Sequence, residues 1–191
     1  MDGPDIACIV EGKGEVSAAP VLIRRIARTL NQFPRVHHVR GNRSEITGPA
    51  VVGCVRIALS KAADPRILLL FDADDDPACT LGPQCLELLR TLAGHRRAAV
   101  VLAVREFENW FIAGIEGLWG KRGIPDGLRP PANLESIRGA KEWISRNMAG
   151  GRRYHEPRDQ PAFAELFDME RARMLSPSFD KLWREIEKLL S

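Results

Sequence analysis

Residues 67–76 read Ile-Leu-Leu-Leu-Phe-Asp-Ala-Asp-Asp-Asp, in which five apolar side chains are followed directly by an acidic turn. An apolar run of this length, bounded by a turn, predicts a strand that is buried on both faces. The sequence contains three more runs of this kind, the second of them interrupted by two histidines: Ile6–Val10, Val36–Val39 and Ala98–Val104. We therefore expect four short strands.

Helical periodicity fills the segments that follow these runs, over residues 16–30, 50–62, 77–93 and 107–118. Pro20 implies that the first helix either begins near Ser17 or has a kinked first turn. Asp76 and Pro77 fit the N-cap and the first position of the third helix. Strands and helices that alternate in this way predict an α/β fold with a mostly parallel four-stranded sheet flanked by helices.

The remainder of the chain has no further strand pattern. Residues 117–131 are rich in Gly and Pro and indicate a loop, and a helical pattern over residues 178–190 follows a start signal at Ser176. We expect residues 1–118 to form the α/β core and residues 119–191 to form a helical C-terminal elaboration packed on that core, within a single structural domain.

The composition excludes some classes of protein. Among 191 residues, 28 Lys and Arg oppose 25 Asp and Glu, and this formal charge of +3 does not support nucleic-acid binding by bulk charge alone. No apolar run approaches the roughly 20 residues that cross a bilayer, and the acidic N-terminus does not resemble a signal peptide. We therefore expect a cytoplasmic protein that does not bind membranes.

The acidic turn after the third run is the strongest candidate site. Side chains two positions apart on an extended strand share a face, so Asp72 and Asp74 are expected to converge on one cation. Mg²⁺ or Mn²⁺ would offset the repulsion among these carboxylates and prefers oxygen ligands. Asp75 and Asp76 are read as a solvated turn, with Asp76 as the helix cap.

Further acids follow the first and the fourth runs, at the sheet edge where ligands gather in such folds. Glu11 precedes Gly12 and ends the first run, and Glu15 opens the next helix, where the helix dipole alone would also favour it. Glu106 and Glu108 follow the fourth run and are candidates for catalysis or metal binding.

Basic residues near these acids are candidates for phosphate contacts. Lys13 lies in the loop after Glu11, and Arg105 precedes Glu106, although a plain surface position remains open for Lys13. We also place Arg152, Arg153 and Tyr154 at the substrate, because they combine charge with a ring that can stack on a base, although an exposed loop would explain them equally well.

The Glu-Gly after the first run and the Asp-x-Asp after the third resemble the signature of the Rossmann-like TOPRIM fold of topoisomerases, primases and the overcoming-lysogenization-defect (OLD) nucleases. The chain is closer still to a TOPRIM-like family, domain of unknown function 4276. That resemblance rests on residues 9–12, 71–76, 105–108, 159–161 and 176–179.

This resemblance implies phosphodiester hydrolysis of DNA or RNA with one or two Mg²⁺ or Mn²⁺ ions. Glu11 would be the general acid/base or a metal ligand, and Asp72 and Asp74 would bind metal. Glu15 would correspond to a second Glu of the OLD nucleases, which carry an ATPase domain on the same chain. Lys141, after Gly139-Ala140, resembles a position that is often Lys in the family and would be a catalytic residue at the phosphate, although a plain surface position remains open for it. No Walker motif is present in this chain, so the resemblance implies an ATPase encoded by a neighbouring gene. It also leads us to expect a role in phage defence or a toxin-like system, and a homodimer.

Two other functions remain open. A TOPRIM-like domain can serve as a non-catalytic partner or sensor of an ATPase. Alternatively, an Asp-x-Asp after an apolar strand also occurs in haloacid-dehalogenase phosphatases, where Asp72 would be the nucleophile, although that strand is normally the first of the fold.

The charges are unevenly distributed along the chain. Residues 16–44 contain six arginines and no acid, at positions 24, 25, 28, 35, 40 and 43. An acidic crevice on an Arg-rich body suits an enzyme that cuts phosphodiesters, so the position of these arginines relative to the acids is the question that the fold must answer.

Overall fold

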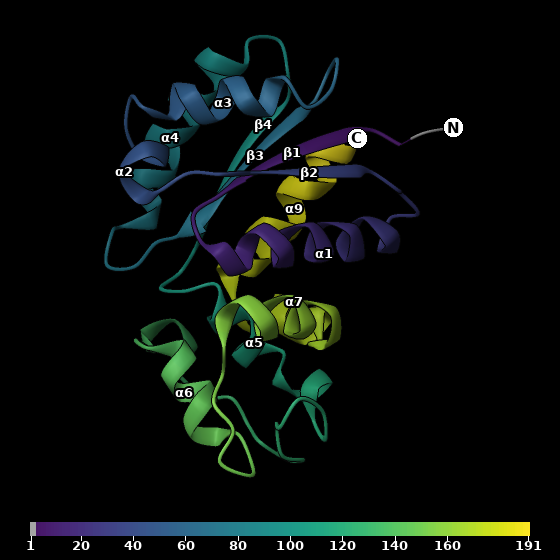
Figure 1. Ribbon diagram of the computed structural model, residues 1–191, viewed down its shortest axis with the longest axis vertical. Coiled ribbons are helices and arrows are strands. Elements are labelled where there is room, and N and C mark those ends of the chain that lie inside the picture. The colour runs from purple at the N-terminus through teal and green to yellow at the C-terminus, as the bar shows by residue number, and fades with distance from the viewer. Residues whose placement is uncertain (1–2) are drawn as a thin grey trace.

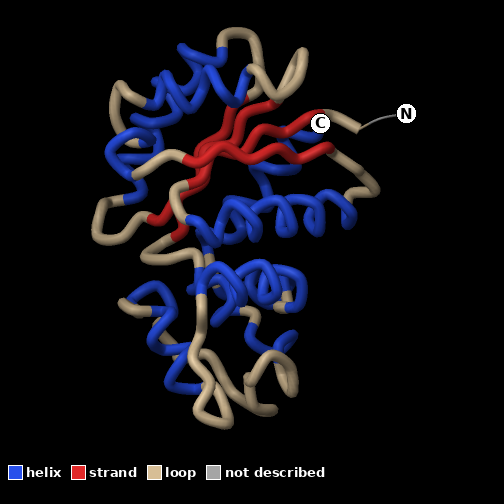
Figure 2. Tube along the Cα trace, viewed as in Figure 1, coloured by secondary structure: helices blue, strands red, loops and turns tan. Residues whose placement is uncertain are grey.

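The computed structural model describes residues 3–191 and contains one four-stranded sheet, shown in red in Figure 2. Its strands are β1 (Asp5–Val10), β2 (Arg35–Arg40), β3 (Arg66–Asp72) and β4 (Ala98–Ala103). They lie in the order β2-β1-β3-β4 and every neighbouring pair is parallel. This arrangement, with helices on both faces and further helices at the C-terminal end, confirms the predicted α/β fold.

Alternating side chains of the strands enter two hydrophobic layers. Ile9 and Leu69 belong to the layer beneath α3 (Val51–Leu59) and α4 (Ala78–Ala93), whereas Val10 and Leu70 face the opposite layer. The latter is covered by α1 (Lys13–Thr29) and α9 (Pro177–Leu190), so the sheet lies between two groups of helices (Figure 1). Burial on both faces explains the uninterrupted apolar runs.

The strand order creates a switch point between β1 and β3. The chain passes from β1 to β2 on one side of β1 and then returns to place β3 on its other side. In open parallel sheets, ligands bind where the connections diverge in this way, at the carboxyl ends of the strands. Glu11 directly follows β1 and Asp72 ends β3, so both acids lie at that point.

Two predicted helix starts are wrong. The first helix begins at Lys13 and includes Pro20 in its interior, so it does not begin near Ser17. The missing N–H of Pro20 removes one helical hydrogen bond, but the surrounding helix buries an apolar face that outweighs this loss. The N-cap of α4 is Pro77, and the side chain of Asp76 does not cap that helix.

The C-terminal helices share one apolar core with α1 and the sheet. Aromatic rings meet edge to face in this core, with centroid separations of 5.3 Å for Phe111–Phe167, 5.7 Å for Phe111–Phe163 and 5.5 Å for Phe167–Phe179. The side chain of Ser176 accepts a hydrogen bond from the Phe179 N–H and caps α9, as the sequence predicted. The remaining elements are α2 (Arg43–Ile46), α5 (Glu108–Ala113), α6 (Ala140–Asn147), α7 (Glu156–Leu166), α8 (Met169–Leu175) and the 3₁₀ helices Ile115–Leu118 and Leu134–Ser136.

None of the helices in the described part of the chain has the length and apolar character needed to span a membrane. The four cysteines carry free thiols, and in residues 3–191 only Cys79 is exposed, whereas Cys8, Cys54 and Cys85 are buried.

Candidate functional site: two acid clusters at the carboxyl edge of the sheet

The acids at the switch point separate into two groups, because successive side chains leave a strand on opposite faces. The inner acid cluster lies on the α1 side and consists of Glu15, Asp72, Glu108 and Glu156, together with Lys141. The outer acid cluster lies around α2 and consists of Glu11, Asp74 and Asp76, together with Arg43.

Asp72 is the last residue of β3 and links the sheet to the inner acid cluster. Its Oδ1 accepts a hydrogen bond of 2.7 Å from the N–H of Phe107, which precedes α5. Burial raises the pKa of Asp72 well above its ordinary value, and the negative charges of Glu15 and Glu108 raise it further. Asp72 is therefore close enough to Glu15 and to Glu108 for their charges to oppose its ionisation.

Glu15 lies in the first turn of α1, and only 5% of its surface is exposed. Its Oε2 accepts hydrogen bonds from the N–H groups of Glu11 and Gly12, at 3.1 and 3.0 Å. These contacts satisfy N–H groups at the helix start. Burial nevertheless raises the pKa of Glu15, against the effect of the two backbone donors. Glu15 therefore lies at the start of a helix, where the sequence analysis expected the helix dipole to favour it, and its side chain also belongs to the inner acid cluster.

Glu108 begins α5 and is completely buried. Its Oε1 accepts hydrogen bonds from the Tyr154 hydroxyl at 2.9 Å and from Gln160 Nε2 at 3.1 Å. Within residues 3–191, its Oε2 has no hydrogen-bond partner, and neither has the buried Oε1 of Gln160. Burial raises the pKa of Glu108 to about 7, although Lys141 opposes the shift. A carboxylate kept ionised here needs a nearby positive charge.

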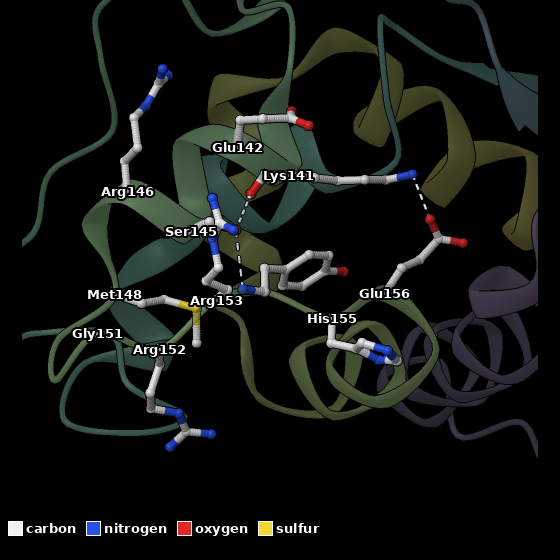
Figure 3. A pocket seen from close by; sticks show the side chains of 11 residues that line it. Lys141, Glu142, Ser145, Arg146, Met148, Gly151, Arg152, Arg153, His155 and Glu156 are labelled. Atoms are coloured by element: carbon white, nitrogen blue, oxygen red, sulfur yellow. Dashed lines mark hydrogen bonds and ion pairs between the residues drawn. The ribbon is translucent and has the colours of Figure 1, made fainter.

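Lys141 is the cation of the inner acid cluster. Its Nζ donates a hydrogen bond of 2.6 Å to Glu156 Oε2, and the two side chains point toward each other in Figure 3. Burial would lower the pKa of Lys141, but Glu108, Glu156 and Asp72 together raise it. The pKa of Glu156 is lowered because Lys141 outweighs the effect of burial. Lys141 is therefore not the plain surface lysine that the sequence left open.

Arg43 from α2 occupies the centre of the outer acid cluster. Its guanidinium lies 2.5 Å from Asp76 Oδ2, 3.6 Å from Asp74 Oδ2 and 3.7 Å from Glu11 Oε2. It also donates to the backbone carbonyls of Asp72 and Ala73, and lies over the ring of Phe71, 5.2 Å from its centroid. The Arg43 side chain thus connects the acidic turn after β3 with Glu11 at the end of β1.

Glu11 is half-buried, with 29% of its side chain exposed. Burial raises its pKa, Arg43 lowers it and Asp74 raises it again, with a net upward shift. Its buried Oε2 lacks a hydrogen-bond partner in the described part of the chain and has only the longer ion pair with Arg43.

The expectation that Asp72 and Asp74 share a strand face is wrong. Strand β3 ends at Asp72, and Asp74 has a φ of 51°, so the alternation does not extend to it. Asp74 is instead exposed over 64% of its side chain and faces Arg43. Asp75 is not a free turn residue, because it pairs with Arg105 and, at 2.8 Å, with Arg138. The predicted substrate contact Arg105 thus braces the acidic turn.

Glu106 does not join either cluster through its side chain. Its Oε1 accepts hydrogen bonds from the N–H groups of Gly139 and Ala140, at 2.8 and 3.1 Å. Glu106 therefore accepts hydrogen bonds from the N–H groups at the start of α6, a helix distant in sequence, and does not cap α5. This contact also fixes the helix that carries Lys141, which gives Glu106 a positioning role where the sequence had placed a catalytic one.

The other predicted substrate contacts divide into exposed and buried residues. Lys13, Arg152 and Arg153 are exposed. Tyr154 is directed inward, with its hydroxyl on Glu108 and its ring edge to face with Phe163 at 5.4 Å between centroids. A ring packed in this way is not available to stack on a base, so the predicted stacking role of Tyr154 is wrong.

The chemistry of the site suits a hard cation, although no complete set of ligands is formed. Among residues 3–191, the side chain of Glu135 left aside, no group of three or more His, Cys, Asp or Glu side chains is arranged to hold a metal ion. Two buried carboxylate oxygens, Oε2 of Glu11 and Oε2 of Glu108, nevertheless lack hydrogen bonds within those residues. Oxygen donors of this kind are the ligands of Mg²⁺ and Mn²⁺. The inner acid cluster contains donors of this type, but Glu15, Asp72 and Glu108 are not arranged as a formed metal site.

Sequence reasoning missed Glu156 and Gln160, and it listed Arg43 only as one of six arginines. Glu156 has a weak local signal, since it precedes a proline at the start of a helix, whereas Gln160 lies within the block 159–161. Of the six arginines, Arg43 lies in the outer acid cluster, and Arg40 donates to the Glu11 carbonyl. By contrast, Arg25 donates to the carbonyls of Ala164 and Phe167, in and directly after α7.

The fold and these clusters define an α/β protein with a buried carboxylate site at the switch point of a parallel sheet. The chain belongs to the family described as Domain of unknown function (DUF4276), whose model matches residues 10–187. No curated protein and no solved structure matches it.

Proposed function

We propose that this chain is a TOPRIM-type, Mg²⁺- or Mn²⁺-dependent hydrolase that cleaves phosphodiester bonds of DNA or RNA. The observation that carries this proposal is the inner acid cluster, in which the charges of Glu15 and Glu108 oppose the ionisation of the buried Asp72 at the switch point. Burial of several carboxylates is unfavourable for folding unless a cation compensates, and Lys141 supplies a single positive charge.

In this proposal each residue of the site has one role. Glu15, Asp72 and Glu108 would hold one ion, Asp74 would contribute to a second, and a metal bound there would offset negative charge on the phosphate. Glu11 accepts a proton from the attacking water, because its Oε2 has no hydrogen bond and its raised pKa suits a base. Lys141 stabilises charge on the phosphate, and Tyr154 keeps Glu108 in place.

The biological setting that accompanies this proposal is a cytoplasmic enzyme, in phage defence or a toxin-like system, that works with an ATPase encoded by a neighbouring gene. A homodimer belongs to the same proposal. The relation to the TOPRIM domain of OLD nucleases rests on Glu11-Gly12 and Asp72-Ala73-Asp74, each at the carboxyl end of its strand.

A non-catalytic partner or sensor of an ATPase is the second candidate, and Arg43 favours it. The guanidinium pairs with Glu11, Asp74 and Asp76, so the outer acids share one structural counter-ion without any metal. In this candidate the acids stabilise the turn after β3 and the chain does no chemistry.

A cleavage and binding experiment separates the two candidates. Wild type, Asp72→Asn and the exposed control Asp64→Asn are incubated with supercoiled plasmid, single-stranded DNA and structured RNA, with Mn²⁺ or EDTA, and Mn²⁺ binding is measured by calorimetry. We expect Mn²⁺-dependent cleavage by wild type and Asp64→Asn, and at least a hundredfold loss in Asp72→Asn. Equal cleavage by wild type and Asp72→Asn would refute the hydrolase. Absence of both Mn²⁺ binding and cleavage, with the neighbouring ATPase added, would establish the non-catalytic candidate.

A further inference from the structure

A basic groove leads from the surface to the inner acid cluster. It is a cavity of about 1010 Å³ between α6 and the loop before α7. Lys141 and Glu156, which belong to the inner acid cluster, line one end of it. Arg146 and Arg152 extend away from that pair in Figure 3. The groove therefore connects a positively charged surface with the candidate catalytic acids.

The charge of the groove is positive after its internal pair is counted. Glu156 is neutralised by Lys141 at 2.6 Å, which leaves Arg146, Arg152 and Arg153 against Glu142 among the lining residues. The three arginines are exposed, and among the described side chains neither Arg152 nor Arg153 forms an ion pair. Solvated guanidinium groups without protein partners are free to bind phosphate oxygens.

The groove offers more charge than stacking surface. Two rings are among its described lining residues: that of Tyr154 is packed against Phe163, and only the small imidazole of His155 is exposed. Binding by stacked bases needs exposed rings, whereas phosphate contacts fix a strand without reading its sequence. The chemistry of this surface therefore matches a sugar-phosphate backbone more closely than it matches bases.

We propose that this groove holds the backbone of a nucleic-acid strand and guides it, independently of sequence, to the inner acid cluster. The proposal rests on the proposed function, since it supplies that site with its substrate. Contacts with about three phosphates predict a slope of about −2 in the logarithm of affinity against the logarithm of salt concentration for a single strand. Affinity should then fall about sixteenfold between 50 and 200 mM salt.

The test measures binding in EDTA, so that cleavage plays no part. Fluorescence anisotropy is recorded for labelled dT20, dA20 and a mixed-sequence duplex, with wild type and with Arg152→Glu/Arg153→Glu. The matched control is Arg56→Glu/Arg90→Glu, which makes the same change of charge at exposed positions on α3 and α4, across the sheet. We expect the groove variant to lose at least tenfold in affinity, the control to lose less than twofold, and dT20 and dA20 to bind within threefold of each other.

Three outcomes overturn the groove: no binding by wild type at 50 mM salt, equal losses in the groove variant and the control, or an affinity that depends strongly on base identity. Circular dichroism confirms that both double variants are folded. If the groove variant loses binding while wild type shows no cleavage in Mn²⁺, strand binding by the groove is supported and the proposed hydrolase activity is refuted. If wild type cleaves but the groove variant binds normally, strand binding by the groove is refuted and the hydrolase activity is supported.

Discussion

Replacement of Glu108 by Gln should stabilise the folded protein at high pH. Burial raises the pKa of this carboxyl from 4.5 to about 7, and Lys141 already opposes that shift, so the net value includes its attraction. At about 1.4 kcal/mol for each step of one in pKa, ionised Glu108 costs about 3 kcal/mol of folding free energy. The side chain is fully buried, so solvent screens little of this cost.

The sign of the pH dependence follows from proton binding. Between pH 4.5 and 7 the folded state holds a proton on Glu108 that the unfolded state releases, so the stability of the wild type falls as pH rises through this window. Gln has the same shape but does not ionise. We therefore expect equal stability of Glu108→Gln and wild type at pH 4.5, and an advantage of about 3 kcal/mol for the variant at pH 8.

Urea unfolding followed by tryptophan fluorescence at pH 4.5, 6, 7 and 8 measures this difference, with the exposed Glu87→Gln as the control. An advantage that does not change with pH, or a variant less stable than wild type at pH 8, would refute the assigned burial cost. Addition of Mn²⁺ at pH 8 extends the experiment. If Glu108 holds the ion, wild type should gain more stability from Mn²⁺ than Glu108→Gln does.

Two further substitutions test other contacts. In Gly14→Ala, the new Cβ would lie 2.1 Å from Gln160 Oε1, so we expect urea unfolding to show a loss of about 2 kcal/mol in the free energy of unfolding. The control Gly53→Ala in α3 meets nothing within 4 Å, so its free energy of unfolding should be unchanged or higher by up to about 1 kcal/mol. Equal effects of the two substitutions would contradict the close packing of α1 on α7. In Arg43→Gln, Glu11 and its acidic neighbours lose their counter-ion, so the loss of stability should be about 1–2 kcal/mol larger at pH 8 than at pH 4. A loss that does not depend on pH would mean that Arg43 stabilises the fold only through its hydrogen bonds to backbone carbonyls.

The sheet could be predicted because its signal is local. Strands β1, β3 and β4 are buried on both faces and read as apolar runs, whereas the edge strand β2 is partly exposed and its run is interrupted by two histidines. The acids that follow β1 and end β3 come directly after those runs. The prediction failed where one residue leaves the regular backbone, since the positive φ of Asp74 ends the alternation on which its shared face with Asp72 depended. No periodicity in the sequence reveals where such a change occurs.

The partners of the site could not be predicted because they are distant in sequence. Arg43 reaches Asp76 across 33 positions, and Tyr154 reaches Glu108 across 46. The same applies to Glu106, whose carboxylate meets the start of α6 only after the chain has folded back. Residue types at one location indicate which chemistry is available, but tertiary packing decides whether a tyrosine meets solvent or a buried carboxylate.

The exposure of a single thiol gives this chain a natural reporter. In residues 3–191, Cys79 is the one exposed cysteine; it lies in the first turn of α4, three positions after Asp76. A maleimide fluorophore should therefore react there and leave the buried Cys8, Cys54 and Cys85 untouched. Because the dye would sit beside the turn that Arg43 fastens, a change in its emission would report movement of that turn when a cation or a nucleic acid binds, without any mutation of the protein.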